Sequence, residues 1–150
     1  MQVTKYCFPY FIDRGIYSNV LGFLGGISLA IMMARICQLY PNAVSSKLVH
    51  MFFLFYSNWE WPIAVNLQHY KSVHMRYPVW DPQKNPADKK HLMPIITPSY
   101  PQQNSTYNVS KSTSKIIQKE LQYAATVSQH ILRGKTAWTS MFQQASFFSL

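Results

Sequence analysis

The chain has 150 residues, enough for one domain at most or for part of a larger one. Apolar residues make up 48% of it and charged residues only 13%, against about a quarter in typical domains, which indicates faces that lie against other protein. A net charge of +9 favours phosphate-bearing partners or an anionic membrane, unless the basic residues merely scatter over the surface.

Residues 1–13 show no hydrophobic period that predicts an element. Pro9 argues against a continuous helix there, because proline lacks the N–H group that a helix interior uses. We therefore expect no continuous helix before Arg14.

A long uncharged stretch follows, and it has opposing interpretations. Twenty residues without a charge lie between Arg14 and Arg35, about the length of a membrane span, so a membrane helix over Gly15–Ala34 is one alternative. Three glycines crowd a window of five residues in its middle, however, and glycine weakens a helix. We favour a turn-rich approach over Gly15–Gly25 and one buried helix over Gly26–Tyr40, and a turn in the core is a third alternative.

A second helix is predicted after Pro41, with Ser45 or Ser46 as its cap. Its apolar residues recur at three- and four-residue spacing, which is typical of a buried helix face. They are Leu48, Val49, Phe52, Phe53 and Tyr56. Because the link is short, this helix is expected to pack antiparallel to Gly26–Tyr40.

Six of the nine prolines lie between Pro78 and Pro101, which predicts an extended strap over the surface and neither helix nor central strand. Apolar side chains along the strap are expected to anchor it in a helical core. They are Trp80, Leu92, Met93, Ile95 and Ile96.

A third helix is predicted over Thr113–Leu132, capped by Ser110 or Ser112 and closed by Gly134. Its expected buried face consists of Ile117, Leu121, Ala124, Ser128 and Ile131. A last short helix should carry Trp138, Met141 and Phe142. The predicted fold is all-α, an irregular helical domain with a proline-rich extended strap.

Several stretches resemble, in the same order, the central domain of the eukaryotic poly(A) polymerase family. They are Gly15–Gly26 (GIYSNVLGFLGG), Cys37–Ala43 (CQLYPNA), Trp59–Pro62 (WEWP), Pro78–Pro82 (PVWDP) and His91–Ser110 (HLMPIITPSYPQQNSTYNVS). The resemblance covers about Arg14 to Phe148. It implies a central domain over residues 14–150, truncated before the RNA-binding domain, with residues 1–13 as a divergent lead-in outside it.

The family adds AMP from ATP to RNA 3′ ends, through two Mg or Mn ions held by three aspartates of a preceding sheet domain. The acidic residues of this chain are Asp13, Glu60, Asp81, Asp88 and Glu120. No two of them form an Asp-x-Asp pair, so we expect no metal site and no catalytic residue here. The two cysteines form no CxxC pair and the five histidines lack paired ligand spacing, which argues against zinc as well.

By this resemblance, four residues would contribute to a nucleotide site. Tyr17 would reach the ATP phosphates and Asn19 the adenine or the sugar, while Gly26 and Ile27 would line the adenine pocket. Ordinary packing is the alternative for Tyr17 and Ile27. Asn19 and the glycines would form a polar surface at a helix N-terminus, which attracts phosphate.

Asn108 is a weaker candidate for contact with the RNA strand, with helix capping as the alternative. Two positions depart from the family pattern. Phe8 stands where the family has a lysine that reaches the nucleotide, nine positions before Tyr17, and Leu29 stands where tryptophan is usual.

The resemblance thus predicts a poly(A) polymerase central domain that is inactive alone. The RNA 3′ end and ATP would be its partners, the cleavage and polyadenylation machinery a further one, and the nucleus its location, with the cytoplasm as an alternative. A non-catalytic binding fragment is the second hypothesis, and the membrane protein is the third.

Overall fold

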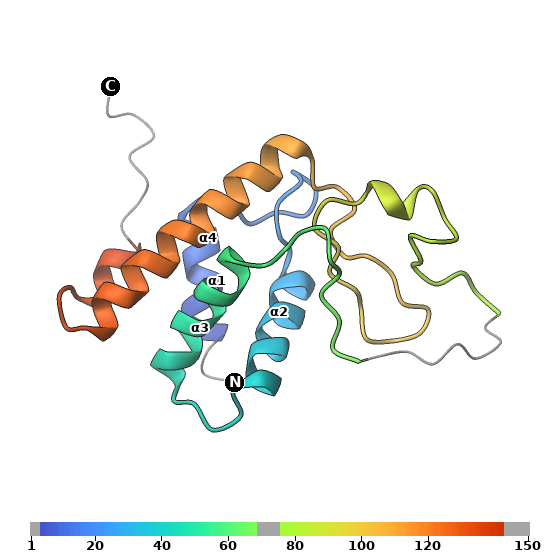
Figure 1. Cartoon of the computed structure of the whole chain (residues 1–150). Coiled ribbons are helices and arrows are strands. Elements are labelled where there is room, and N and C mark those ends of the chain that lie inside the picture. The colour runs from blue at the N-terminus through green and yellow to red at the C-terminus, as the bar shows by residue number, and fades with distance from the viewer. Residues whose placement is uncertain (1–3, 69–75, 143–150) are drawn as a thin grey trace.

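The computed structural model describes residues 4–68 and 76–142, which form an irregular, all-helical fold (Figure 1). In chain order the elements are α1 (Thr4–Asp13), α2 (Gly26–Leu39), α3 (Ser45–Ser57), the 3-10 helix η1 (Asp88–Lys90), α4 (Lys111–Leu132) and the 3-10 helix η2 (Trp138–Phe142). Over the described ranges the chain forms isolated β-bridges and no longer strand. The predicted all-α class is confirmed.

Helix α1 contradicts the expectation for the lead-in, because Pro9 lies inside a continuous helix. Cys7, Tyr10 and Phe11 on this helix are buried in the core. Burying one large apolar side chain contributes about 1.5–3 kcal/mol, so these residues together offset the roughly 3 kcal/mol that an interior proline costs. Tertiary burial therefore outweighs the local rule.

Helix α2 begins at Gly26 as predicted and ends one residue early, at Leu39. The preceding residues 14–25 form turns and no helix. Across residues 4–68 and 76–142, no helix combines the length and the apolar character that a membrane span requires. The membrane-helix alternative is therefore not supported.

Helix α3 buries its predicted apolar stripe in full, between α2 and α4. Figure 1 shows that α2 runs down to the loop after Tyr40 and α3 returns beside it, as predicted. The predicted cap is wrong. Val44 is the N-cap, without a side-chain hydrogen bond, and Ser45 is already the first helical residue. Packing of the stripe therefore stabilises this helix without help from a capping hydroxyl.

Helix α4 has the predicted cap, face and end, but it begins at Lys111, two residues before the predicted start. The hydroxyl of Ser110 accepts from the backbone N–H of Thr113 at 3.2 Å, and the hydroxyl of Thr113 accepts from the N–H of Ser110 at 2.9 Å. At the other end Gly134 has φ +69° and its N–H donates to the carbonyl of Ile131 at 2.9 Å. This positive φ is the conformation that glycine adopts most readily after a helix.

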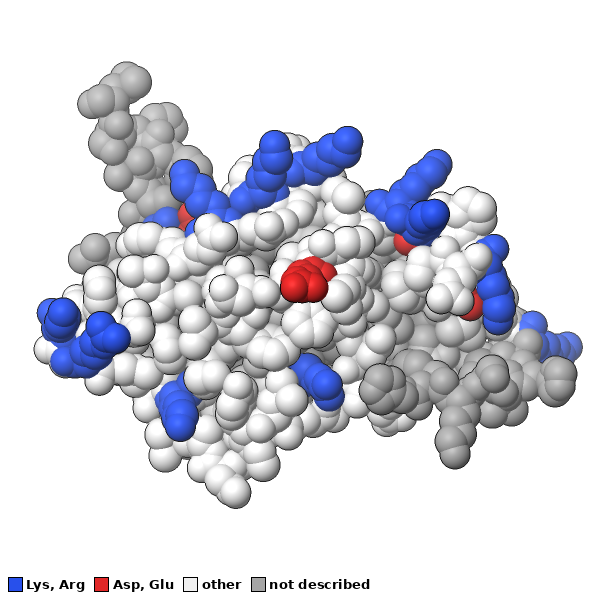
Figure 2. Space-filling view, in the orientation of Figure 1, with Lys and Arg blue, Asp and Glu red and all other residues white. Residues whose placement is uncertain are grey.

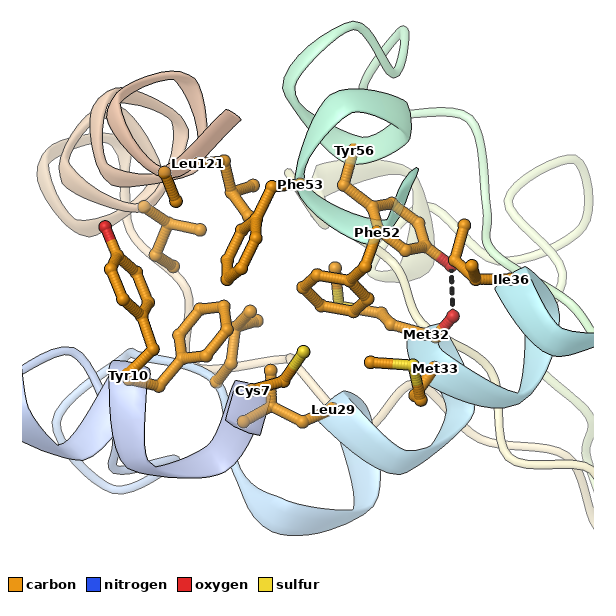
Figure 3. Packing of buried hydrophobic residues seen from close by; sticks show 14 of the residues in the cluster. Cys7, Tyr10, Leu29, Met32, Met33, Ile36, Phe52, Phe53, Tyr56 and Leu121 are labelled. Carbon is orange, nitrogen blue, oxygen red and sulfur yellow. Dashed lines mark hydrogen bonds between the residues drawn. The ribbon is translucent and has the colours of Figure 1, made fainter. Parts of the chain in front are cut away.

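The core gathers aromatic rings and methionines between the helices (Figure 3). The rings of Phe52 and Phe53 meet edge to face, with centroids 5.2 Å apart. The buried hydroxyl of Tyr56 donates to the carbonyl of Met32 at 2.8 Å, which joins α3 to α2 (Figure 3). This bond satisfies the Tyr56 hydroxyl where the two helices cross.

A charged contact joins the end of α1 to the middle of α4. The guanidinium of Arg14 donates to the carboxylate of Glu120 at 2.7 Å, with both side chains largely buried. The Tyr10 hydroxyl donates to the same carboxylate at 3.1 Å. Burial raises the pKa of Tyr10 far above its usual value, so the hydroxyl stays protonated and remains a donor.

The proline-rich segment lies beside the helices and winds through turns and bends around the short helix η1 (Figure 1). Met93, Ile95 and Ile96 are buried, whereas Trp80 and Leu92 are half-buried. Ile95 pairs with Val65 in a parallel bridge.

Side-chain hydrogen bonds hold the end of this segment, and we call Asn104 and its partners the Asn104 network. The carbonyl oxygen of the Asn104 side chain accepts from the backbone N–H of Ile95 and from that of Thr106, each at 3.0 Å. Next to it, the hydroxyls of Ser105 and Ser28 lie 2.9 Å apart, which links the network to α2. The network therefore fixes the chain that leads into α4.

Candidate nucleotide site

The predicted site residues lie on the loop that precedes α2 and on the first turn of that helix. Tyr17 and Leu24 form a parallel bridge across the loop, and the N–H of Gly22 donates to the carbonyl of Asn19 at 3.1 Å. Gly22 has φ +82°, a conformation that other residues rarely adopt. The loop therefore closes on itself and presents Tyr17 and Asn19 beside the helix start.

Tyr17 lies against Gly26. A Cβ atom added to Gly26 would sit 3.1 Å from the Tyr17 hydroxyl and 3.6 Å from the ring of Phe8. Tyr17 remains 39% exposed as a residue. The bare glycine thus permits the phenol to lie over the N-terminus of α2.

Asn19 lies against Gly25, the N-cap of α2, where an added Cβ would be 3.3 Å from the Cβ of Asn19. Its side-chain oxygen is buried and has no hydrogen-bond partner within the described part of the chain. A buried acceptor without a donor costs free energy, so a donor brought within reach of this atom would stabilise the loop.

Asn108 lies beside the same loop. Its side-chain amide donates to the backbone carbonyl of Asn19 at 3.1 Å, and its own carbonyl would be 2.8 Å from a Cβ on Gly22. The cap of α4 is Ser110, so Asn108 does not fill that role. The structure thus brings the predicted RNA residue into contact with the predicted nucleotide residues.

Ile27 follows Gly26 on the first turn of α2 and is 66% exposed, so it is no part of the core. That turn has no acidic residue and no side-chain cap. Uncapped N–H groups and the helix dipole give such a terminus a partial positive charge, which attracts anions. The turn can therefore combine an apolar side chain with a phosphate-attracting backbone.

Sequence reasoning missed two contacts that shape this site. Phe8 on α1 packs against Tyr17, with ring centroids 6.2 Å apart. Gly22 meets the backbone of Asn108, far along the chain. The position of Phe8, nine residues before Tyr17, was noted from the family pattern. Its contact with Tyr17 could not be predicted because it depends on helix α1, and Pro9 argued against a helix there.

The described residues offer nothing suited to the two divalent ions of the family. Over 4–68 and 76–142 no three His, Cys, Asp or Glu side chains gather in a way that could hold a metal. Glu120 is bound to Arg14, and Asp81 lies 3.5 Å from the ammonium group of Lys84. A two-metal centre needs several carboxylates aimed at one point, so these residues do not fit it.

A cavity of about 310 Å³ lies elsewhere, between α1, the start of α3 and η2. Its lining residues are Tyr6, Ser45, Ser46, Val49 and Trp138. None of them belongs to the candidate site.

Comparisons with known proteins match residues 10–144 to the family described as "Poly(A) polymerase central domain". The chain is 49% identical over 148 residues to nuclear poly(A) polymerase 2 of Arabidopsis thaliana, which is 98% of this chain and 18% of that protein. Nuclear poly(A) polymerase 4 of the same plant is 47% identical over 148 residues, and the poly(A) polymerase of Dictyostelium discoideum is 48% identical over 139 residues.

A match over most of the chain shows its class, a helical domain that poly(A) polymerases share. The chain belongs to the poly(A) polymerase central-domain family. It spans about a fifth of the length of the curated relatives it matches. The match begins at residue 10, inside α1, and the division at residue 14 stays a prediction.

Proposed function

We propose that this chain forms the central-domain wall of the ATP site of a poly(A) polymerase. One observation carries the proposal: the Tyr17 hydroxyl lies against Gly26 and the Cβ of Asn19 lies against Gly25, both at the N-terminus of α2. Within the described residues the side-chain oxygen of Asn19 has no hydrogen-bond partner. Such a terminus suits a phosphate, and the Asn19 oxygen suits an amine or hydroxyl donor.

Each residue would have a distinct role. The Tyr17 hydroxyl donates to a phosphate oxygen, and the Asn19 oxygen accepts from the adenine amine or a ribose hydroxyl. Gly26 lets a flat base approach the backbone, and exposed Ile27 covers one face of that base. Asn108, bonded to the Asn19 carbonyl, orients that loop and reaches the RNA strand beside it.

The site lacks a cation where the family has one. Phe8 fills the lysine position and packs on Tyr17 instead of meeting a triphosphate. Without that charge and without metal ions, we expect ATP to bind no more tightly than about 1 mM, roughly −4 kcal/mol.

Catalysis in the family needs metal-bound carboxylates, which would come from outside these residues. We therefore expect no AMP transfer by this chain alone, and the non-catalytic binding fragment is the second function that this observation favours. The names of the plant relatives suggest the nucleus as its location. The family resemblance implies the RNA 3′ end and the polyadenylation machinery as partners.

Calorimetric titration of ATP into the chain tests the site. Asn19→Ala should abolish the weak binding, and Lys90→Ala, an exposed lysine on η1, should leave it unchanged. Equal loss from both would show non-specific charge attraction. Micromolar affinity of the wild type would reveal a phosphate site outside this geometry.

A gain of function sharpens the test. Phe8→Lys restores a cation beside Tyr17 and should tighten ATP binding by about tenfold, as a charge-assisted hydrogen bond does. Tyr6→Lys, on the same helix but exposed at another face, adds the same charge away from the site. If both variants gain equally, net charge and not the site explains the gain.

Incorporation of labelled AMP into an oligo(A) primer, with ATP and Mg²⁺ or Mn²⁺, tests the catalytic part. The pure chain should not exceed a blank without protein. Incorporation above that blank would contradict the proposal.

A further inference from the structure

A row of basic residues runs along the exposed side of α4. Lys111, Lys115 and Lys119 recur every four residues and are all exposed, and Tyr123 continues the same row. Residues four apart form a ridge on a helix surface, and each step along it advances about 6 Å. We call these four residues the α4 ridge.

The charge of the ridge is not neutralised by the protein. Over the described ranges none of its lysines forms an ion pair with a carboxylate. The acid of this helix, Glu120, is bound to Arg14 and to the Tyr10 hydroxyl. Figure 2 shows blue side chains lining the upper edge of the molecule, over the start of α4.

Exposed aromatic rings stand at both ends of the lysine row. Tyr107, in the turn before α4, is 61% exposed, and Tyr123 is 42% exposed. The guanidinium carbon of Arg14 lies 4.8 Å from the centre of the Tyr123 ring, which adds a cation beside that ring. Lysines that follow a phosphate backbone and rings that stack on bases are the two parts of a surface for single-stranded nucleic acid.

The ridge also begins at the candidate nucleotide site. Asn108, three residues before Lys111, donates to the carbonyl of Asn19. A strand whose 3′ end lies at Tyr17 and Asn19 can therefore continue onto the ridge without a break.

We propose that the α4 ridge binds the phosphate backbone of single-stranded RNA, upstream of a 3′ end at the candidate nucleotide site. The position of the 3′ end rests on the proposed function, whereas the RNA contact of the ridge does not. The exposed tyrosines at both ends of the lysine row favour RNA over an acidic peptide, which needs no stacking partner.

Fluorescence anisotropy of a labelled 15-nucleotide oligo(A) with the full chain, from 50 to 200 mM salt, tests the ridge. The variant Lys111→Gln, Lys115→Gln, Lys119→Gln should lose at least about tenfold in affinity at 50 mM salt. Its plot of log K against log salt should flatten by about 2, since each of three contacts contributes about 0.7. The matched control is Lys84→Gln, Lys89→Gln, Lys90→Gln, which removes the same charge from the proline-rich segment.

Several outcomes would overturn the proposed RNA contact of the α4 ridge. Equal loss in both triple variants, or no binding of oligo(A) by the wild type, overturns the proposal. Displacement of oligo(A) by polyglutamate of equal charge at the same concentration also overturns it, in favour of an acidic protein partner. Replacing the three ridge lysines by arginine should preserve binding, and loss there would point to a folding defect and against a phosphate contact.

The rings give an independent test. Tyr107→Ala should weaken oligo(A) binding by about fivefold or more if a base stacks on it, with an unchanged salt slope. An unchanged affinity would remove the stacking part of the proposal. If oligo(A) binds through the α4 ridge but Asn19→Ala does not weaken ATP binding, the RNA contact of the ridge is supported and the proposed nucleotide site is contradicted.

Discussion

The α3–α4 pair and the segment from Met93 to Asn108 both place residues in the interior, but different forces hold them. The helix pair buries apolar stripes, with Phe52, Phe53 and Leu121 almost fully enclosed. The segment is held by side-chain oxygens that accept from backbone N–H groups, chiefly the Asn104 oxygen. Apolar contact tolerates small shifts, whereas each hydrogen bond needs one donor in one direction.

This difference explains where the candidate site lies. The helix pair supplies stability, and the hydrogen-bonded segment sets the position of Asn108 and hence of the loop that carries Asn19. Substitutions in the α3–α4 pair should lower the free energy of unfolding and leave the geometry of the candidate site largely unchanged. Substitutions in the segment from Met93 to Asn108 should disturb the candidate site.

The largest effect is expected in the helix pair. Phe53→Ala removes a fully buried ring and should lower the free energy of unfolding by about 3–5 kcal/mol. Leu54→Ala, at the next position but 39% exposed, is the control and should cost far less. Urea denaturation measures both. Similar losses for the two variants would contradict the assigned packing.

The next effect concerns the Asn104 network. Asn104→Ala leaves the buried N–H groups of Ile95 and Thr106 without their acceptor, and should lower the free energy of unfolding by about 2–4 kcal/mol. Asn85→Ala removes a similar bond, to the N–H of Ala87, on the exposed surface and should cost below about 1 kcal/mol. A small cost for Asn104→Ala in urea denaturation would show that the network does not hold the segment.

A pair of glycines separates backbone strain from crowding. Gly15 and Gly22 have φ of +68° and +82°, so alanine at either should cost about 1–2 kcal/mol through strain. Only Gly22 is crowded, since an added Cβ would lie 2.8 Å from the carbonyl oxygen of Asn108, whereas nothing lies within 4 Å at Gly15. Gly22→Ala should therefore destabilise more in urea denaturation and weaken ATP binding, and equal effects would contradict this contact.

The sequence could predict features that depend on neighbouring residues, and it could not predict features that depend on contacts between distant residues. The uncharged stretch and its glycines identified α2, apolar residues on one face identified α3 and α4, and Ser110 was among the predicted caps. These features depend on neighbours along the chain. Helix α1 was missed because Pro9 opposes it locally and only the tertiary burial of Tyr10 and Phe11 stabilises it.

The candidate site shows the same limit. The family resemblance selected Tyr17, Asn19, Gly26, Ile27 and Asn108. No local pattern could reveal that Asn108 bonds to the Asn19 loop or that Phe8 packs on Tyr17, because these residues meet only after folding. The roles of these residues stay predictions that the binding experiments test.

The smallest effect is a pH dependence within the helix pair. The Nδ1 atom of His50 on α3 lies 2.8 Å from the Ser128 hydroxyl on α4, and partial burial lowers the pKa of His50 below its usual 6.5. Between these two pKa values the unfolded chain binds a proton that the folded chain does not, so stability falls as the pH drops through about 6.5. Urea midpoints at pH 7.5 and pH 5.0 measure that loss. His50→Gln should reduce it, whereas Ser128→Ala should lower the midpoint at both pH values and keep a pH dependence. An unchanged pH dependence in His50→Gln would assign the effect to other groups.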